Sequence, residues 1–277
     1  MSTGIGAGIS PVFELKPGGG VPAGCPKSRY SVEFEGNTGT QYLNNNTTAL
    51  AIGGSGGTGS FSISFWLNWS TITTGDEQGV VLFGGGNDPK LQIYLNAASQ
   101  SLLFNANNSS GGGSAYTHGT GNTIFPVIDT WYNFTFVMER TATTINTEWF
   151  KDGVSISTKS GAWPQVDNDL LFPASDNLYF GRRSSSSLEF LEGYLDDFSI
   201  WGQTLTSAEV IELMAVTTTN ACMADLSFYS RIEHWWKMGD PNGPASYPTI
   251  QDAVASAPIT LTMTNMSSAN ITTNVPV

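Results

Sequence analysis

Three aromatic residues, Trp66, Tyr116 and Trp163, have neighbours that suit a sugar-binding surface. Trp66 falls on the otherwise polar side of a predicted strand, whereas Tyr116 and Trp163 fall in stretches predicted to be loops. The apolar face of a sugar ring stacks on an exposed aromatic ring, and polar neighbours then bind its hydroxyl groups. Tryptophan and tyrosine also pack in cores and interfaces, so core packing is the alternative for each residue. The three residues are candidate contacts for a glycan.

The cysteine and histidine residues are too few and too scattered to predict a zinc site. The sequence has two cysteines, Cys25 and Cys222, and neither His118 nor His234 lies near them at ligand spacing. Two interpretations of the cysteines stay open. They are two buried free thiols, or they form one disulfide that joins the N-terminal arm to the segment after the last predicted strand.

Charge and composition exclude several classes of protein. The 277 residues include 11 Lys and Arg against 23 Asp and Glu, which gives a formal net charge of −12. Binding to nucleic acids or to anionic membranes requires clustered basic residues, and the sequence has no such cluster. No apolar run approaches the roughly 20 residues of a membrane helix. Hydrophobic residues make up 40% of the chain, enough to bury a sizeable core, so we expect a folded protein without nucleic-acid or membrane partners.

Alternating apolar and polar residues predict many short strands that would position these side chains. The clearest stretch is FSISFWLNW (61–69), and similar alternation occurs near residues 30–35, 91–95, 132–138, 145–151 and 194–201. Asp152-Gly153 predicts a tight hairpin turn, because a type I′ turn requires positive φ at both central positions and Gly153 adopts it readily. Many short strands separated by turns indicate a β-sandwich.

One short helix is predicted after the last of these strands. Thr206 and Glu209 have the spacing of a capping box, in which each side chain accepts a hydrogen bond from the other residue's backbone N–H. Leu205 and Val210 have the spacing of the hydrophobic staple that accompanies such a box. The helix would then bury a face formed by its apolar residues, Val210, Ile211, Leu213 and Met214.

The two ends of the chain differ from its strand-rich middle. Residues 1–29 are rich in Gly and Pro, and residues 217–277 begin with a Thr-rich linker and contain the adjacent pair Trp235-Trp236. We expect an extended N-terminal arm (1–29), a sandwich (30–216) and a C-terminal tail or assembly segment (217–277). Ordering such arms requires a surface on which to bury their apolar residues, so we expect contacts mainly with other chains. The first residues lack the features of a signal peptide.

Four segments in order resemble the laminin-G-like, concanavalin-A-like lectin and glucanase family. They are FSISFWLNW (61–69), WYNFTFVME (131–139) with EWFKDGVSI (148–156), NLYFGRR (177–183) and EGYLDDFSIWGQTLTSAEVIEL (192–213). Together they extend across the predicted sandwich. The resemblance implies an all-β fold: an antiparallel two-sheet jelly-roll sandwich with one short C-terminal helix and extended arms.

The resemblance also suggests a calcium site at the rim of the sandwich, where loops supply hard oxygen ligands. Asn87 and Asp88 match the place where pentraxins carry a ligand pair, and Asp76 is predicted at the same rim. The second acidic cluster of pentraxins would fall at residues 181–184, which contain no carboxylate. Solvated loop residues are therefore the alternative interpretation, and Ca²⁺ is the one cofactor suggested.

Hydrolases of the same fold carry their paired carboxylates in a Glu-x-Asp-x-(x)-Glu pattern, because the two groups must flank the scissile bond. The nearest stretch, EFLEGYLDD (189–197), lacks this spacing, and we expect no enzymatic activity. Asp196 is instead expected to have a structural role. It would point with Phe198 and Ile200 into the sandwich and accept backbone amides, with a structural calcium ligand as the alternative.

The tail resembles segments of marine phage and other virion-associated proteins, through HWWKMGD (234–240), YPTIQD (247–252) and TLTMTNM (260–266). This resemblance implies a virion structural protein, such as a capsid decoration, fibre or appendage subunit, that displays a lectin-like domain. Its partners would be further copies of itself, other virion proteins and host glycans. It would lie on the particle surface without needing a signal peptide. The alternatives are a free or cell-surface glycan-binding adhesin and, less favoured, a polysaccharide hydrolase.

Overall fold

The computed structural model describes residues 28–36, 40–45, 50–52, 59–72, 77–84, 91–96, 98–106, 116–121, 127–141, 143–162, 171–172, 178–183, 189–218, 223–240, 242–254 and 258–276. Several residues with predicted roles lie outside these ranges, namely Cys25, Asp76, Asn87, Asp88, Trp163 and Cys222. No helix in the described ranges has the length and apolar character needed to span a bilayer.

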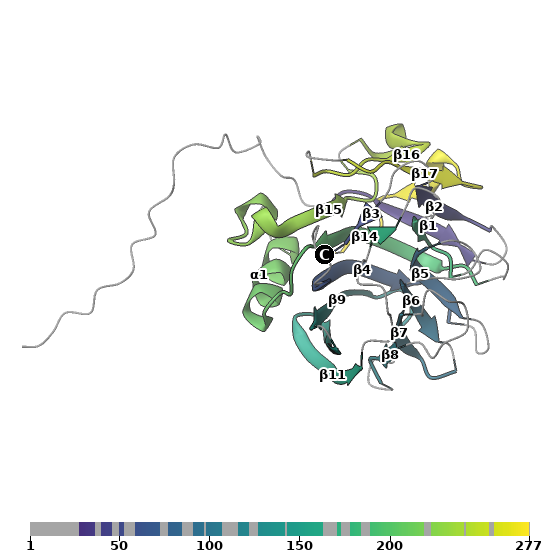
Figure 1. Cartoon of the computed structure of the whole chain (residues 1–277). Coiled ribbons are helices and arrows are strands. Elements are labelled where there is room, and N and C mark those ends of the chain that lie inside the picture. Colours follow the sequence, from purple (N-terminus) through teal and green to yellow (C-terminus); the bar gives the residue numbers. More distant parts are fainter. Residues whose placement is uncertain are drawn as a thin grey trace, which may run out of the picture.

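Two antiparallel sheets form the molecule (Figure 1). In spatial order, the first sheet contains β11 (Val154–Ala162), β10 (Thr144–Lys151), β9 (Trp131–Arg140), β4 (Phe61–Trp69), β14 (Glu192–Trp201), β1 (Ser31–Glu35) and β18 (Ile271–Thr272). A further strand, β15 (Ile232–Trp236), also pairs with β14.

The second sheet lies face to face with the first. In spatial order it contains β16 (Thr249–Ile250), β17 (Leu261–Thr264), β2 (Tyr42–Asn45), β13 (Leu178–Phe180), β5 (Gln78–Phe83), β6 (Leu91–Asn96), β7 (Ser101–Ala106) and β8 (Tyr116–Gly119). A separate short pair joins β12 (Leu171–Phe172) to β3 (Leu50–Ala51). The predicted all-β, antiparallel two-sheet sandwich is confirmed.

The alternation along the strands builds the core between the sheets. The inner face of the first sheet, which faces the second sheet, carries every second residue of β4, beginning with Phe61, and these side chains are almost fully buried. Phe104 of the second sheet stacks on Phe136 of β9 with ring centroids 4.1 Å apart. A run of apolar side chains on one face of each sheet thus produces one continuous core.

The hairpin between β10 and β11 has the predicted turn. Lys151 pairs with Val154, and both central residues have positive φ, 50° for Asp152 and 78° for Gly153. The Asp152 side chain also accepts a hydrogen bond from the backbone N–H of Asn133, at 2.9 Å. These angles are those of the type I′ class, whose twist matches that of the flanking strands.

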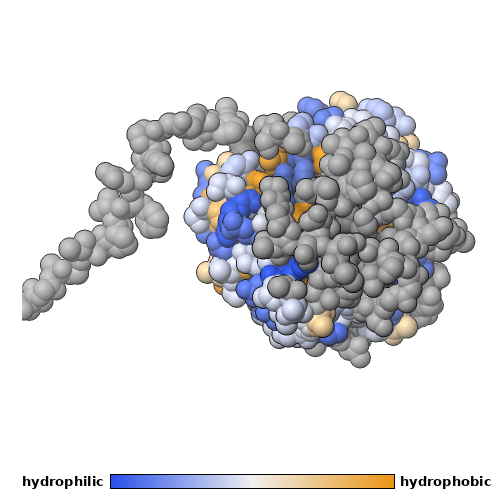
Figure 2. Space-filling view, viewed as in Figure 1, coloured by the Kyte–Doolittle hydropathy of each residue, from blue (hydrophilic) through white to orange (hydrophobic). Residues whose placement is uncertain are grey.

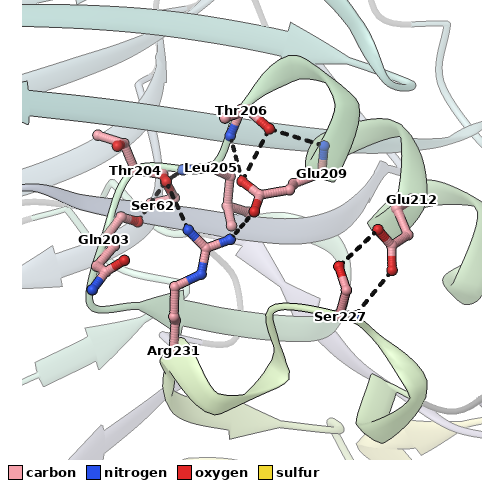
Figure 3. A network of polar contacts seen from close by, with 9 residues as sticks. All are labelled: Ser62, Gln203, Thr204, Leu205, Thr206, Glu209, Glu212, Ser227 and Arg231. Atoms are coloured by element: carbon pink, nitrogen blue, oxygen red, sulfur yellow. Dashed lines mark hydrogen bonds and ion pairs between the residues drawn. The ribbon is translucent and has the colours of Figure 1, made fainter. Parts of the chain in front are cut away.

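The helix α1 (Ser207–Thr218) begins with the predicted capping box (Figure 3). The Thr206 hydroxyl accepts from the Glu209 backbone N–H at 3.3 Å, and the Glu209 carboxylate accepts from the Thr206 backbone N–H at 2.8 Å. Leu205 and Val210 are buried, as expected of a hydrophobic staple. Glu209 also forms an ion pair with Arg231, which ties α1 to the chain that follows it.

The buried face of α1 is narrower than predicted. Val210 and Leu213 pack on the outer face of the first sheet, the face turned away from the second sheet, but Ile211 is 59% exposed. Successive helical residues are rotated by roughly 100°, so Ile211 cannot share the direction of Val210. Figure 2 shows hydrophilic and hydrophobic residues side by side on the surface of this side of the molecule.

Three further helices are short turns of 3-10 type between the strands of the C-terminal segment, namely η3 (Tyr229–Arg231), η4 (Gly243–Ser246) and η5 (Ser268–Asn270). A fourth, η2 (Met223–Asp225), follows α1. The strands of this segment join both sheets: β15 pairs with β14, β18 with β1 and β17 with β2. Trp236 is fully buried and Trp235 is 7% exposed, so the tryptophan pair anchors this segment to the chain's own sandwich.

A bulge interrupts β14 where its neighbour changes from β1 to β15. Asp196 lies opposite Trp66 of β4, and Ser199 lies opposite Ser64, so β14 has one residue more than β4 between these pairs. Asp197 has a φ of 44°, as a residue inside such an irregularity can. One extra residue reverses the side of the sheet on which the following side chains lie.

Because of this bulge, Asp196 is not on the side of the sheet that the sequence predicted. Phe198 and Ile200 join the core, whereas Asp196 lies on the outer face of the first sheet. Its carboxyl group accepts from the backbone N–H of Asp197 at 2.8 Å and from the Ser28 hydroxyl at 2.6 Å. The expected contact with a backbone amide is therefore present, on the opposite face.

Candidate functional site

Trp66 lies on the polar side of β4, as the alternation predicts, but that side is also covered. Trp66 is 4% exposed, and every residue of β4 is buried. Its Nε1 has no hydrogen-bond partner among the described residues. A ring in this position is not presented to solvent, so it does not offer the stacking surface that a sugar would need.

Tyr116 lies in the edge strand β8 instead of a loop, and it belongs to a buried hydrogen-bond network. Its hydroxyl contacts the Thr147 hydroxyl at 2.7 Å and donates to the Lys159 carbonyl at 3.0 Å. The ring nitrogens of His118 lie 2.7 Å from the Thr147 hydroxyl and 2.9 Å from the Ser157 hydroxyl. We call Tyr116, His118, Thr147 and Ser157 the histidine cluster. It connects β8 of the second sheet to β10 and β11 of the first.

The histidine cluster contains a strongly perturbed imidazole. Burial, together with the positive charge of Lys159, lowers the pKa of His118 from 6.5 to about 4. His118 is therefore neutral near pH 7 and can accept one hydrogen bond while donating another. The network closes one edge of the sandwich and leaves Tyr116 only 6% exposed.

Carboxyl groups gather beside the bulge of β14, where the first described residues meet the segment that follows β15. Asp240 accepts from the backbone N–H of Arg29, with distances of 3.1 and 3.0 Å to its two oxygens. Asp197 accepts from Trp235 Nε1 at 3.0 Å. We call Asp196, Asp197 and Asp240 the aspartate cluster. Burial raises the pKa of each of these carboxyl groups, and the charge of Asp197 adds to the increase at Asp196.

A His–Asp pair in the C-terminal segment has a structural environment. His234 Nδ1 lies 2.7 Å from an Asp252 oxygen, and its ring stacks on Trp236. Asp252 also accepts three backbone N–H groups, from residues 235, 254 and 259. No described serine hydroxyl is hydrogen-bonded to this imidazole, so the pair lacks the nucleophile of a catalytic triad. Among the described residues, no group of three or more His, Cys, Asp or Glu side chains could hold a metal ion.

A cavity of about 310 Å³ lies on the outer face of the first sheet, and we call it the polar cavity. Side chains of β9, β10 and β11 form its floor, and Thr204, from the segment before α1, forms part of its wall. The Thr204 carbonyl accepts from Arg231, at 3.4 Å, which holds this wall in place (Figure 3). The cavity is lined by Val137, Glu139, Asn146, Thr147, Glu148, Thr158, Lys159, Ser160 and Thr204.

The floor of the polar cavity is an ordered row of polar side chains. Asn146 lies directly between Glu139 on β9 and Ser160 on β11. Its amide nitrogen donates to Glu139 at 3.1 Å, and its amide oxygen accepts from the Ser160 hydroxyl at 2.8 Å. In the next row, Glu148 lies opposite Thr158 and accepts from the Ser155 hydroxyl. Each side chain is thereby held in a fixed direction.

The polar cavity is lined by two carboxylates, Glu139 and Glu148, and by one ammonium group, that of Lys159. A carboxylate accepts several hydrogen bonds, so Glu139 and Glu148 keep capacity for donors of a ligand. The Lys159 ammonium group donates to the Thr117 carbonyl outside the lining. The arrangement suits a ligand with many hydroxyl groups and no negative charge. The alternation of residues 144–148 would have indicated that Asn146 and Glu148 share a face, but it does not reveal Glu139 or Ser160.

Comparison with known proteins agrees with this architecture. Residues 37–211 match the family model described as the Concanavalin A-like lectin/glucanases superfamily. Among curated protein sequences, none matches the chain. Among solved structures, a "putative carbohydrate binding protein" from Bacteroides ovatus is 14% identical. The match covers 86% of this chain and 60% of that chain, with a TM-score of 0.55.

Two further structures are similar at lower scores. A heptameric SAP-like pentraxin from Limulus polyphemus is 13% identical over 74% of this chain and 90% of that chain, with a TM-score of 0.48. The CBM40 of the IT-sialidase from Ruminococcus gnavus, bound to alpha2,3 sialyllactose, is 13% identical over 66% of this chain and 96% of that chain, with a TM-score of 0.45. At such identities the likeness concerns the fold alone. Because the matched residues 37–211 make up more than half of the chain, the protein belongs to the Concanavalin A-like lectin/glucanases superfamily.

Proposed function

We propose that this chain is a non-catalytic sugar-binding module that a virus particle displays on its surface. The observation that carries the sugar-binding part is the polar cavity, whose floor is the hydrogen-bonded row Glu139–Asn146–Ser160. Fixed acceptors and amide groups discriminate hydroxyl-bearing ligands, because a ligand that lacks the matching donor leaves these groups without partners. The family contains lectins, and the Bacteroides ovatus neighbour of the same fold is described by its ligand class, which supports this assignment.

The test of sugar binding uses the full chain and neutral tetrasaccharides as probes. We expect cellotetraose, maltotetraose or chitotetraose to bind, as measured by calorimetry and by chemical-shift changes at Asn146. Glu148→Gln and Asn146→Ala should weaken the binding at least tenfold, because the first replaces a charged acceptor oxygen by a donor and the second removes a fixed amide group. Glu35→Gln on β1 is the matched control, since it removes the same charge from an exposed position outside the cavity lining. Unchanged affinity in both cavity variants would refute the assignment.

The non-catalytic part rests on the chemistry of the carboxylates. The stretch 189–197 lacks the paired pattern of hydrolases, and Glu139 and Glu148 are engaged with Asn146 and Ser155. A glycosidase requires one carboxylic acid and one carboxylate flanking the scissile bond. We expect no release of reducing ends from laminarin, agarose or carrageenan. Release that disappears in Glu148→Gln or Glu192→Gln would contradict a purely binding role.

The virus-particle part rests on the resemblance of HWWKMGD (234–240) and the later tail segments to virion-associated proteins. It predicts that the protein is present at high copy number in purified particles and that it assembles with itself. Mass spectrometry of particles and mass photometry of the isolated protein test these statements. A monomer at high concentration that is also missing from particles would favour a free or cell-surface adhesin instead.

A further inference from the structure

A second row of side chains crosses the outer face of the first sheet at the other end of β9. Trp131 on β9 lies opposite Asn68 on β4, Asn68 lies opposite Tyr194 on β14, and Tyr194 lies opposite Glu33 on β1. Directly opposite side chains on neighbouring strands are close enough to interact. Four adjacent strands thus place two aromatic side chains, one amide and one carboxylate in a single line.

The two aromatic rings of this row lean toward each other. Their strands are separated by β4, yet the ring centroids of Trp131 and Tyr194 are 6.3 Å apart, with an angle of 49° between the planes. Asn68 lies between them in the row and is only 2% exposed. Trp131 and Tyr194 themselves stay partly exposed, in contrast to the buried Trp66 two residues before Asn68 on β4. The two rings form a shallow aromatic platform.

Hydrogen bonds fix the polar edge of each ring. Trp131 Nε1 donates to the Asn274 side chain at 3.1 Å, and the Tyr194 hydroxyl donates to the Glu33 carboxylate at 2.9 Å. Rings held in this way lose little conformational entropy when a ligand binds, which favours affinity. Glu33 and Asn274 also place hydrogen-bonding groups at the rim of the platform, where the hydroxyl groups of a stacked ligand would lie.

We propose that Trp131 and Tyr194 form a second sugar-binding surface, which stacks the apolar face of a neutral pyranose. This inference extends the proposed function, because it assumes that sugars are the ligands of this chain. An aromatic ring covers the C–H face of a pyranose while the hydroxyl groups at the ring edge bind polar neighbours. The rim carboxylate of Glu33, on a chain of net charge −12, disfavours sulfated or carboxylated sugars.

The platform and the polar cavity are separate sites on one face. Trp131 and Glu139 are eight residues apart on β9, about 26 Å at the usual rise per residue. Between them the outer face carries Val137, which packs with residues of α1. One monosaccharide cannot reach both sites. Two sites on one module would raise the avidity for a polymeric glycan or a dense glycan layer.

The experiment compares binding at the two sites within the same protein. Chitotetraose and cellotetraose are titrated into labelled protein, and the indole N–H of Trp131 and the amide of Asn146 are followed by NMR. We expect both signals to shift, with separate affinities. Trp131→Ala should reduce binding at the platform at least tenfold, as followed in this variant at the backbone N–H of Tyr194, and leave binding at the polar cavity unchanged. Tyr194→Phe keeps the ring and should reduce platform binding less than threefold.

Further variants and measurements distinguish a loss of sugar binding from a loss of folded structure. Asn274→Ala removes the hydrogen bond to Trp131 and one group at the rim but keeps the ring, so it should weaken platform binding less than Trp131→Ala does. Circular dichroism checks the fold of every variant. If Asn146 responds to sugar while Trp131 does not, or if Trp131→Ala changes nothing, the platform is overturned and the proposed function stands. If neither signal responds to sugar, both the platform and the proposed sugar-binding function are wrong. Tighter binding of a sulfated tetrasaccharide at Trp131 would overturn the preference for neutral sugars.

Discussion

The histidine cluster and the aspartate cluster each contain a buried titratable group, His118 or Asp196, and each joins distant parts of the chain, but they are built on opposite principles. In the histidine cluster, neutral groups of β8, β10 and β11 satisfy one another, and His118 is held without charge. In the aspartate cluster, three carboxyl groups share a small region with Lys237 as a neighbouring cation, and burial raises their pKa values. The first cluster ties sheet to sheet, and the second ties residues 28–29 and the segment around Trp235 and Asp240 to β14.

The difference shows how the same burial gives opposite pH responses. Burial disfavours the charged form of any group, so it lowers the pKa of a histidine and raises that of an aspartate. For His118, the unfolded chain binds the proton first as the pH falls, so stability is lost between about pH 6.5 and pH 4. For Asp196 the folded state binds the proton more tightly, so stability is lost as the pH rises through its raised pKa.

The largest expected effect is the acid response of the histidine cluster. Lowering the pH from 7 to 4 should remove up to about 3 kcal/mol of stability through His118, which is 3% exposed. His118→Gln, which stays neutral, should lose this part of the pH dependence. Urea denaturation of both proteins at several pH values provides the measurement. Parallel stability curves for the two proteins would mean that His118 titrates normally.

A smaller effect of opposite sign is expected at the aspartate cluster. Asp196→Asn keeps the shape of the side chain and removes its charge, so it should stabilise the protein above neutral pH by about 2 kcal/mol. Below about pH 3 the variant and the parent should have similar stability, because Asp196 is then mostly protonated in both the folded and the unfolded state. Asp225→Asn, at an exposed position, serves as the control. Destabilisation at every pH would indicate that the carboxylate is needed in its charged form.

Within the histidine cluster, Tyr116→Phe should cost about 1.5 kcal/mol at neutral pH. The change removes hydrogen bonds to Thr147 and Lys159 but keeps the ring. The pH dependence due to His118 should persist, because the imidazole keeps Thr147 and Ser157 as neighbours. A variant as stable as the parent would show that the hydroxyl finds water instead.

The smallest effect is expected at the helix cap, which is exposed and lies outside both clusters. Thr206→Ala should reduce the free energy of unfolding by about 1 kcal/mol, with little dependence on pH above 5. Thr206→Ser, which keeps the hydroxyl, is the matched control. A denaturation midpoint that stays unchanged in the alanine variant would mean that the Glu209–Arg231 ion pair suffices to hold the helix start.

The strands, the hairpin at Asp152-Gly153 and the helix cap follow from local sequence patterns, and the structure contains them. These features depend on residues within a few positions of one another, where periodicity and turn chemistry are informative. The pairing of the C-terminal strands with β1, β2 and β14 is a long-range arrangement. These C-terminal strands have five, four and two residues, which is too short for the alternation of apolar and polar residues to indicate their partners.

The polar cavity and the aspartate cluster were harder to predict, because a bulge determines which neighbours one residue of each has. A regular hairpin at Asp152-Gly153 would place Asn146 opposite Lys159, but a register shift between Trp149 and Phe150 places it opposite Ser160. The bulge at Asp197 likewise moves Asp196 to the outer face. Sequence alternation assumes an unbroken period of two, so a single inserted residue misplaces every later side chain. The alternation along β4 places Trp66 on the correct face, but the pattern of one strand does not reveal that other parts of the chain bury this face.

The pairing of β1 with β18 determines how the domain would respond to tension. Ser31 lies opposite Thr272, and the Ser31 hydroxyl donates to the Asn274 carbonyl, so both ends of the described chain leave from the same end of this strand pair. A force that pulls residues 28 and 276 apart would load the hydrogen bonds of the pair one after another instead of all together. Each bond contributes only about 1 kcal/mol, so sequential loading opens the pair easily. We therefore expect β18 to peel away at low force while the central pair β4–β14 stays intact, so that a stretched tether would lengthen before the sandwich unfolds.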